Sequence, residues 1–219
     1  MSAGEPGWPA ALKVGHAACP QSLTGVTVLL PDHPVVMAVD VRGGGPGTRE
    51  TDALVPDTLV ERVHALVLSG GSVFGLAAAD ALALELARRG IGLPLGEGKG
   101  RLAIPVVPSA ILFDLANGGN KGWARPGGDT PPYGRLALEA LAGARAVPEA
   151  GCVGAAFGAR AGSRPGGVGI AKARLDDGGL VAALVVVNSF GEVVAGAPPE
   201  EGPVPAPKRP RLGGLETQH

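Results

Sequence analysis

The chain has 219 residues and a formal net charge of −1, and 45% of its residues are hydrophobic while only 3% are aromatic. This length suits one large domain or two small ones, with an aliphatic core of Val, Leu, Ile and Ala. The near-neutral charge provides no broad basic surface for a phosphate backbone, which argues against a nucleic-acid partner. The 37 glycines and 21 prolines are separated by apolar runs, so low-complexity disorder is not expected.

Strands and one short helix are predicted for the first third of the chain. Gly25–Leu30 and Val35–Val41 are predicted strands joined by the turn-like run Pro31-Asp32-His33-Pro34. Pro56 and Asp57 favour a short helix through residue 63. His64–Leu68 is a short apolar run and is consistent with a buried strand.

The middle of the chain contains two predicted helices. Ser72–Arg89 has a helix-forming composition and ends in two cations before Gly90, which are helix-stop signals. Ile104–Val107 is another strand candidate, and the Gly- and Pro-rich run Lys121–Pro132 is predicted to be a loop. Tyr133–Ala146 is rich in Ala and Leu and is predicted to be the second helix.

Three strands and a tail are predicted for the last third. The strands are Cys152–Phe157, Val168–Leu175 and Leu180–Asn188. Asp176–Gly179, between the last two strands, is a strong hairpin-turn signal. Residues 197–211 contain six prolines and are expected to form an extended, poorly packed tail.

Signals for targeting, redox chemistry and metal binding are few. The N-terminus lacks a basic start followed by an apolar core, and no apolar run is long enough to span a bilayer, so a cytoplasmic protein is the simplest interpretation. Cys19 and Cys152 are expected to be reduced, structural thiols. The histidines are His16, His33, His64 and His219. Because they are scattered, neither a zinc site nor another cofactor is expected.

Two glycine-rich runs carry most of the local information. Val39–Asp52 combines four glycines with five ionisable side chains, and glycine lets such a run bend sharply. These side chains are Asp40, Arg42, Arg49, Glu50 and Asp52. They could be catalytic, but an internal ion-pair network that shapes the loop is the better interpretation.

The second run contains Gly70, Gly71 and Ser72, where a predicted strand leads into a helix. Free N–H groups at a helix start can bind an anion, and a serine at such a turn can be a nucleophile. The simpler alternative is that Ser72 only caps the helix, and the local pattern favours it. The full Gly-x-Ser-x-Gly pattern is not present.

Asn188 and Phe113 also have two interpretations each. Asn188 follows the apolar run Leu184–Val187, so its amide either caps a turn or directs an N–H toward an oxyanion. From the residues alone the turn is favoured. Phe113 is expected in the core rather than in a pocket.

Eight segments in a fixed order cover most of residues 14–194. They are Val14–His16, Thr24–Val28, Val39–Asp52, Leu68–Leu76, Val106–Leu115, Gly151–Ala155, Gly166–Gly169 and Val185–Gly191. Together they resemble the DmpA/P1 family of self-cleaving amidohydrolases, peptidase family S58. That family contains L-aminopeptidase/D-amidases, β-peptidyl aminopeptidases and nylon-oligomer hydrolases.

The resemblance implies an α/β fold, a layered αββα sandwich, in a protein that cuts itself into α- and β-chains. The cut precedes a Ser or Thr that becomes the nucleophile, with its own α-amine as the base. Residues 1–196 would be the α-chain part of a single domain, and 197–219 a Pro-rich tail leading to self-cleavage after His219. The nucleophile would then lie on a companion β-chain. The alternative is a truncated protein without activity.

The resemblance also assigns site residues. It reverses the interpretation of Asn188, which becomes an oxyanion donor, and makes Gly70, Gly71 and Ser72 a pocket-forming turn without a nucleophile. Phe113 stands near a position where some relatives have a catalytic Tyr hydroxyl, and the resemblance adds it to the substrate-pocket residues.

Two departures from the family pattern concern the substrate pocket. Pro165 replaces the Lys that usually precedes Gly166-Gly167-Val168-Gly169, so Arg160 or Arg164 is expected to supply the positive charge there. The run Gly154–Ala159 differs from the usual Gly-Ala-Gly-Thr-Gly-Ala.

The expected activity is hydrolysis of an amide or peptide bond in a small substrate by the α-part together with its β-chain. A homo-oligomer of such αβ units is also expected. The alternative is a non-catalytic small-molecule-binding or assembly protein that retains the scaffold.

Overall fold

A five-stranded mixed sheet forms the centre of the computed structural model, which describes residues 7–193. Its strands, in spatial order, are β1 (Leu12–Cys19), β2 (Thr24–Pro31), β4 (Leu66–Ser69), β7 (Ser109–Ile111) and β3 (Thr48–Arg49). β4 and β7 run parallel, whereas the other neighbours are antiparallel. The predicted tail at 197–211 and the cleavage point after His219 lie outside the described residues.

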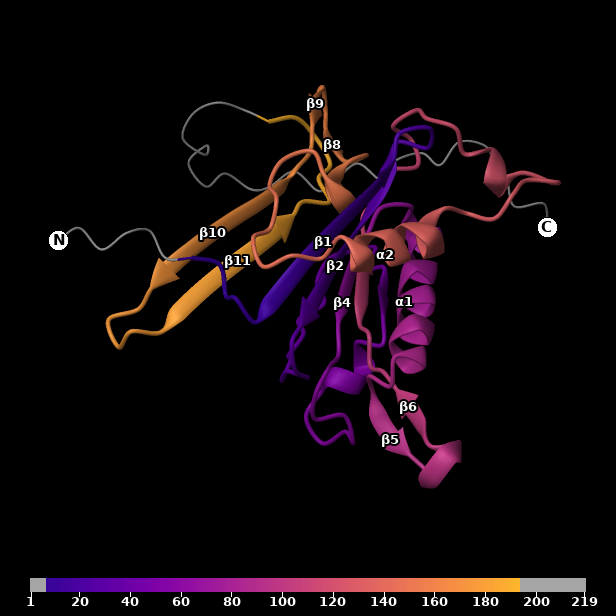
Figure 1. The fold of residues 1–219 in the computed structure, drawn as a ribbon. Coiled ribbons are helices and arrows are strands. Elements are labelled where there is room, and N and C mark those ends of the chain that lie inside the picture. The colour runs from indigo at the N-terminus through magenta and orange to yellow at the C-terminus, as the bar shows by residue number, and fades with distance from the viewer. Residues whose placement is uncertain (1–6, 194–219) are drawn as a thin grey trace.

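Two helices, α1 (Ala77–Arg88) and α2 (Tyr133–Ala142), cover one face of this sheet (Figure 1). α1 buries residues at helical spacing, because one apolar stripe faces the sheet. The main core joins both helices to β2 and β4, and includes Val26, Val28, Val67, Leu82, Leu86, Tyr133 and Leu136. The predicted aliphatic core is therefore confirmed.

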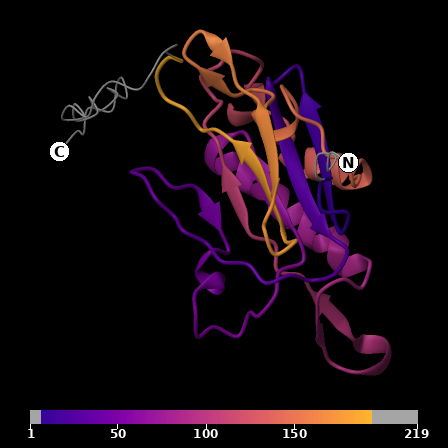
Figure 2. The same ribbon diagram turned by 90° about the vertical axis from the view of Figure 1, so that its left-hand side faces the viewer.

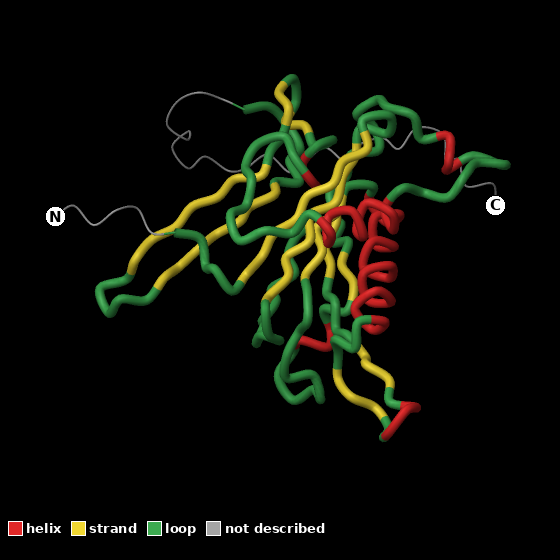
Figure 3. Tube along the Cα trace, in the orientation of Figure 1, coloured by secondary structure: helices red, strands yellow, loops and turns green. Residues whose placement is uncertain are grey.

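The opposite face of the sheet contacts a short 3₁₀ helix, η5 (Gly154–Ala156), and beyond it lies the hairpin of β10 (Val168–Arg174) and β11 (Leu180–Val186) (Figures 1 and 3). One side of the hairpin packs through Ile170 and Leu184 on a small second core. Alternate residues on β11 point the other way. Val181 and Val185 are each 50% exposed, so this side of the hairpin has no partner within residues 7–193.

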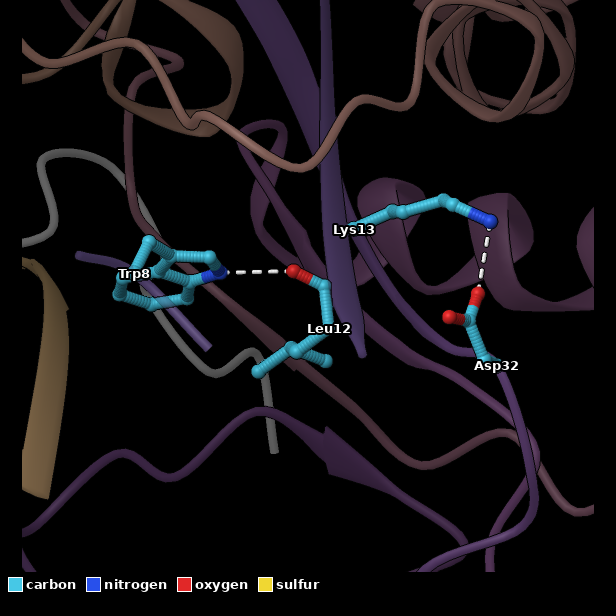
Figure 4. A network of polar contacts seen from close by, with 4 residues as sticks. All are labelled: Trp8, Leu12, Lys13 and Asp32. Carbon is cyan, nitrogen blue, oxygen red and sulfur yellow. Dashed lines mark hydrogen bonds and ion pairs between the residues drawn. The ribbon is translucent and has the colours of Figure 1, made fainter. Parts of the chain in front are cut away.

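Two polar contacts hold the beginning of the described chain against β1 and β2 (Figure 4). The Trp8 Nε1–H donates to the Leu12 carbonyl at 2.6 Å. The Lys13 ammonium and the Asp32 carboxylate form an ion pair at 2.6 Å, which links β1 to the residue that follows β2. Both groups are about 40% exposed, so this pair contributes little to stability.

The remaining elements are short. They are η1 (Asp52–Leu54), η2 (Ser72–Leu76), β5 (Leu93–Leu95), η3 (Gly98–Gly100), β6 (Leu102–Ile104), η4 (Gly122–Ala124), β8 (Arg160–Ala161) and β9 (Arg164–Pro165). Among the described residues, no helix combines the length and the apolar character needed to cross a membrane.

Three predicted elements are wrong. Residues 36–41 form no strand, since only Val35 bridges to Val63 and Val36 is 75% exposed. Residues 56–63 form no helix, and Asp57 has a φ of +71°, which a right-handed helix does not allow. Cys152–Phe157 contains η5 instead of a strand, because Gly154 takes a φ of +51° and turns the chain.

Several predicted boundaries also shift. The helix expected at Ser72–Arg89 starts as the 3₁₀ helix η2 and is α-helical only from Ala77, and the strand expected at His64–Leu68 is β4, Leu66–Ser69. The strand expected at Ile104–Val107 is instead β6, which ends at Ile104. α2 ends four residues earlier than expected, at Ala142, because Gly143 follows it. β1 and β7 were not among the predicted strands.

Candidate active site

Asn188 lies just beyond the end of β11, and its amide group has a fixed orientation. Its Oδ1 accepts the backbone N–H of Phe113 at 2.9 Å. Because a backbone N–H needs a hydrogen-bond acceptor, this bond requires the amide oxygen, and not the amide nitrogen, to face Phe113. The Nδ2 group forms no hydrogen bond within residues 7–193, so its two N–H groups can donate to another molecule or chain.

A cavity of about 270 Å³ borders Asn188. Its wall is formed by the glycine-rich run, including Asp40, Arg42 and Gly45–Thr48, and by Pro108–Ile111 at β7. The first glycine-rich run of the sequence and Asn188 therefore meet, although about 140 residues separate them along the chain.

The five ionisable residues of this run do not form one network, and Asp52, the first residue of η1, forms no ion pair within residues 7–193. Arg42 pairs with Asp40 at 2.6 Å, and both side chains are largely exposed. Arg49 reaches out of the run to Asp80 on α1. Glu50 has a φ of +59°, and its Oε2 accepts the Val107 N–H at 2.9 Å. The predicted internal ion-pair network is therefore replaced by one local pair and two contacts that anchor the run to the body.

The Gly70–Ser72 turn follows β4, and its backbone N–H groups are all used within the protein. Gly70 N–H donates to the Gly25 carbonyl at 2.9 Å, and Ser72 N–H donates to the Leu112 carbonyl at 2.9 Å. Gly71 N–H donates to Asp114 Oδ1 at 2.7 Å. The N–H groups are thus not free to bind an anion. Gly71 and not Ser72 is the N-cap of η2, so the prediction from the local pattern that Ser72 caps the helix is wrong. That the turn lines the substrate cleft remains a prediction.

Glycine is required at position 71 for two reasons. Its φ is +87°, and a Cβ there would collide with the ring and hydroxyl of Tyr133. Tyr133 is fully buried, and burial raises the pKa of its hydroxyl to about 12. Within residues 7–193 its oxygen has no hydrogen-bond partner. The turn is therefore packed against a neutral phenol.

Asp114 is the buried polar residue that sequence reasoning missed, although it lies in one of the family-like segments. It is 2% exposed, and its Oδ2 accepts the Thr24 hydroxyl at 2.6 Å while Oδ1 holds Gly71. Burial raises the pKa of this carboxyl, and the bonds from Thr24 and Gly71 and the charge of Lys121 oppose that rise. Asp114 thus connects β2, the Gly70–Ser72 turn and the segment after β7.

Lys121 is held beside this network by carbonyl oxygens. Its ammonium donates to Ser22 O at 2.5 Å, to Gly118 O at 2.8 Å and to Asn117 Oδ1 at 3.0 Å. Burial lowers the pKa of Lys121, and the negative charge of Asp114 opposes this. These hydrogen bonds therefore anchor the predicted 121–132 loop at its first residue.

Phe113 and the two arginines of the predicted pocket lie apart from the 270 Å³ cavity. Phe113 is 59% exposed, so the core interpretation is wrong. It borders a second cavity, of about 520 Å³, together with Arg160, Phe190 and Glu192. Arg164 lies on β9, where Ala161 is its partner, and does not border this cavity.

His64 and the two cysteines lie apart from the cavity that borders Asn188. Cys19 is buried, Cys152 is exposed, and both thiols are free. His64 Nδ1 accepts the Val106 N–H at 3.1 Å, and burial lowers the pKa of His64. Across residues 7–193, no group of three or more His, Cys, Asp or Glu side chains is placed to hold a metal ion.

The model of peptidase family S58 matches residues 10–203. The chain belongs to peptidase family S58. It is 47% identical over 173 residues to an uncharacterized aminopeptidase of Mycobacterium tuberculosis, and 46% identical over 177 residues to one of Mycobacterium leprae. Each match covers 78% of this chain and 46% of the relative, so the chain spans about half the length of these S58 relatives.

A solved structure, the PH0078 protein of Pyrococcus horikoshii OT3, has a related fold. The TM-score is 0.60 at 22% sequence identity, and the match covers 83% of this chain and 53% of that protein. This likeness confirms a mixed α/β fold, with a mixed sheet and few helices.

Proposed function

We propose that this chain is the α-part of an S58 amidohydrolase that cleaves amide or peptide bonds in small substrates. Family membership and the aminopeptidase names of its relatives support a hydrolase. Because the chain spans about half of those relatives, the remaining half is proposed to be a companion β-chain from the same precursor, beginning with the nucleophilic Ser or Thr.

This proposal rests on the orientation of the Asn188 side-chain amide. The Phe113 N–H occupies its amide oxygen, which leaves Nδ2 to donate elsewhere at the edge of a cavity. A donor fixed before the substrate binds stabilises a developing oxyanion without a cost of reorganisation. Asn188 is therefore assigned this role.

The proposed reaction is acyl transfer to the nucleophile and then to water. The hydroxyl oxygen attacks the substrate carbonyl while the free α-amine of the same residue takes the hydroxyl proton. The tetrahedral oxygen accepts a hydrogen bond from the Asn188 N–H. When the C–N bond breaks, the leaving amine takes the proton, and water then hydrolyses the ester.

The exposed side of β11 supports the two-part architecture. Val181 and Val185 on β11, and Val187 directly after it, are each at least 50% exposed, and exposed apolar surface of this kind marks an interaction site. We propose that strands of the companion part pack here and complete an αββα sandwich with residues 1–196. Cytoplasmic αβ units that assemble into a homo-oligomer complete the proposal.

Intact-mass spectrometry of the product of the complete gene tests the proposal. Two fragments, with hydrolysis of aminoacyl p-nitroanilides and an acyl adduct on the first residue of the second fragment, are expected. A single unprocessed fragment without amidase activity would favour the non-catalytic binding or assembly protein. A covalent adduct on Ser72 would overturn the proposed mechanism.

A further inference from the structure

A cavity of about 430 Å³ opens between the beginning of β1, the end of β2 and the turn that follows α1. The end of α1 and the β5–β6 hairpin lie at one end of the molecule, whereas the last described residues, in yellow, lie at the other (Figures 1 and 2). Among the described residues, this cavity shares no lining residue with the cavity that borders Asn188. Its volume is typical of small-molecule sites, so it is a separate place for such a ligand.

His64 supplies a buried hydrogen-bond donor on the wall of this cavity. It is 4% exposed, and its Nδ1 accepts the Val106 N–H at 3.1 Å. Burial lowers the pKa of His64, so the imidazole is neutral near neutral pH and carries its hydrogen on Nε2. Within residues 7–193, Nε2 has no hydrogen-bond partner, and it is not one of the polar atoms sealed off from solvent. The Nε2–H is therefore available to an acceptor in the cavity.

Lys13 and Asp32 place opposite charges on the same wall. They form an ion pair at 2.6 Å that uses one oxygen of Asp32 (Figure 4). An ammonium has three N–H donors and a carboxylate has two acceptor oxygens, so each group can bind a further partner. Asp32 would repel a ligand that is only negative, and Lys13 would repel one that is only positive. A zwitterion, which carries both charges, matches the pair.

The rest of the wall is largely apolar. Leu30 and Pro31 contribute from the end of β2, Pro34 from the loop that follows, and Ile91 from the turn after α1. Ile91 is 38% exposed, so the body of the protein does not fully cover its side chain. Small-molecule sites combine such an apolar wall with a few polar groups that fix the orientation of the ligand. An aliphatic side chain is the group that suits this wall.

We propose that this cavity binds a free amino acid with an aliphatic side chain. The carboxylate of the ligand accepts the Nε2–H of His64 and an N–H of Lys13, and its ammonium pairs with Asp32. The side chain of the ligand packs on Leu30 and Ile91. None of these residues takes part in the proposed acyl transfer, so this site does not depend on the proposed hydrolase.

Isothermal titration of the complete gene product with L-leucine tests the site. Isoamylamine is leucine without its carboxylate, and 4-methylpentanoate is leucine without its ammonium. Neither contains an amide bond that the proposed hydrolase could cleave. Each lost charge removes a charge-assisted contact, so both compounds should bind at least about tenfold more weakly than leucine.

Lys13→Met tests the protein side of the same contact. It removes the ammonium and should also weaken leucine binding at least about tenfold. Its ion pair is about 40% exposed and contributes little to stability, so the variant should fold normally. Lys172→Met is the matched control, because Lys172 is exposed on β10 and does not border the cavity. It should bind leucine as the natural protein does.

A second measurement locates the bound leucine. In the complete gene product labelled with ¹⁵N-histidine, the ring signal that is absent from His64→Gln belongs to His64. This signal should shift as leucine is added, and in Lys13→Met the shift should need a higher leucine concentration. The proposal is overturned if leucine does not bind or the His64 signal does not move. It is equally overturned if either leucine fragment binds as tightly as leucine, or if Lys13→Met binds leucine as well as the control. Neither measurement uses catalytic activity, so a failure here leaves the proposed hydrolase untouched.

Discussion

The side-chain oxygen of Asn188 accepts the backbone N–H of Phe113 at 2.9 Å, across 75 residues of sequence. This bond joins the end of the β10–β11 hairpin to the segment that follows β7 in the central sheet. One amide thus fixes the distance between two layers of the fold and orients its own spare N–H groups.

Replacing Asn188 with Asp separates these two tasks. The carboxylate can still accept the Phe113 N–H, so thermal stability should change little, but it has no N–H to donate and adds a negative charge. The value of kcat should fall at least about 10²–10³-fold, as for loss of an oxyanion donor. Asn188→Ala should lose activity and also the bond to Phe113. Normal turnover in both variants would show that Asn188 has no catalytic role and only caps the end of the strand.

Gly71→Ala should destabilise the protein more than the same change at Gly178. Both residues have a φ of +87°, so the backbone cost of about 1–2 kcal/mol is shared. Only at Gly71 does the new Cβ meet Tyr133, whereas nothing lies within 4 Å of it at Gly178. Urea unfolding should show an additional loss of about 1–3 kcal/mol at position 71. Equal losses at the two sites would contradict the packing of Gly71 on Tyr133.

Asp114→Ala should destabilise the fold by about 2–4 kcal/mol, because it leaves the Gly71 N–H and the Thr24 hydroxyl buried without an acceptor. Asp114→Asn keeps an acceptor and tests the charge. Since burial raises the pKa of Asp114 above 3.8, the native state binds more protons than the unfolded chain in that range. The unfolding free energy of the natural protein should fall as the pH rises through this window, and Asn should remove that part of the fall.

His64 should make the fold sensitive to mild acid. Burial lowers its pKa below 6.5, so the unfolded chain binds the proton first and stability is lost as the pH falls below about 6.5. Protonation also removes the lone pair that accepts the Val106 N–H. Denaturation followed from pH 8 to pH 5 should show a smaller loss in His64→Gln than in the natural protein. His33→Gln, a change at an exposed position, should not alter the profile.

Residues 1–219 expressed alone should aggregate or form a tight oligomer. The exposed valines on β11 and the open strand edges of its hairpin would be uncovered. Val181→Lys/Val185→Lys should raise the soluble fraction, which sedimentation at several concentrations would measure. A cooperative, soluble monomer of the unaltered chain would count strongly against the two-part architecture.

Local sequence signals predicted the elements whose residues also pack as those signals require. β2, β4 and both helices combine strong periodicity with burial in the structure, whereas the exposed 176–179 turn follows from its turn chemistry. Val35–Val41 has the composition of a strand, but its side chains find no apolar layer to cover them. Strand propensity without burial did not suffice there.

The candidate site was predictable only in part, for a topological reason. Asn188 and the glycine-rich run were identified as patterns, but their meeting depends on the hairpin folding over the sheet. Asp114 was passed over because no local pattern distinguishes a buried carboxylate from a surface one. Its partners Thr24 and Gly71 are 90 and 43 residues away.

The parallel pairing of β4 with β7 has a consequence for the timing of folding. Ser69 and Ile111 lie side by side but are about forty residues apart in sequence, with α1 and the β5–β6 hairpin between them. Contacts that close such long loops form slowly, because the chain entropy is lost before the contacts repay it. The Gly71–Asp114 bond and the cavity wall along β7 should therefore be among the last parts of the molecule to form. If the precursor cuts itself with the same groups, self-cleavage should begin only after these parts have formed. The rate at which the cut end appears would then report when folding is complete.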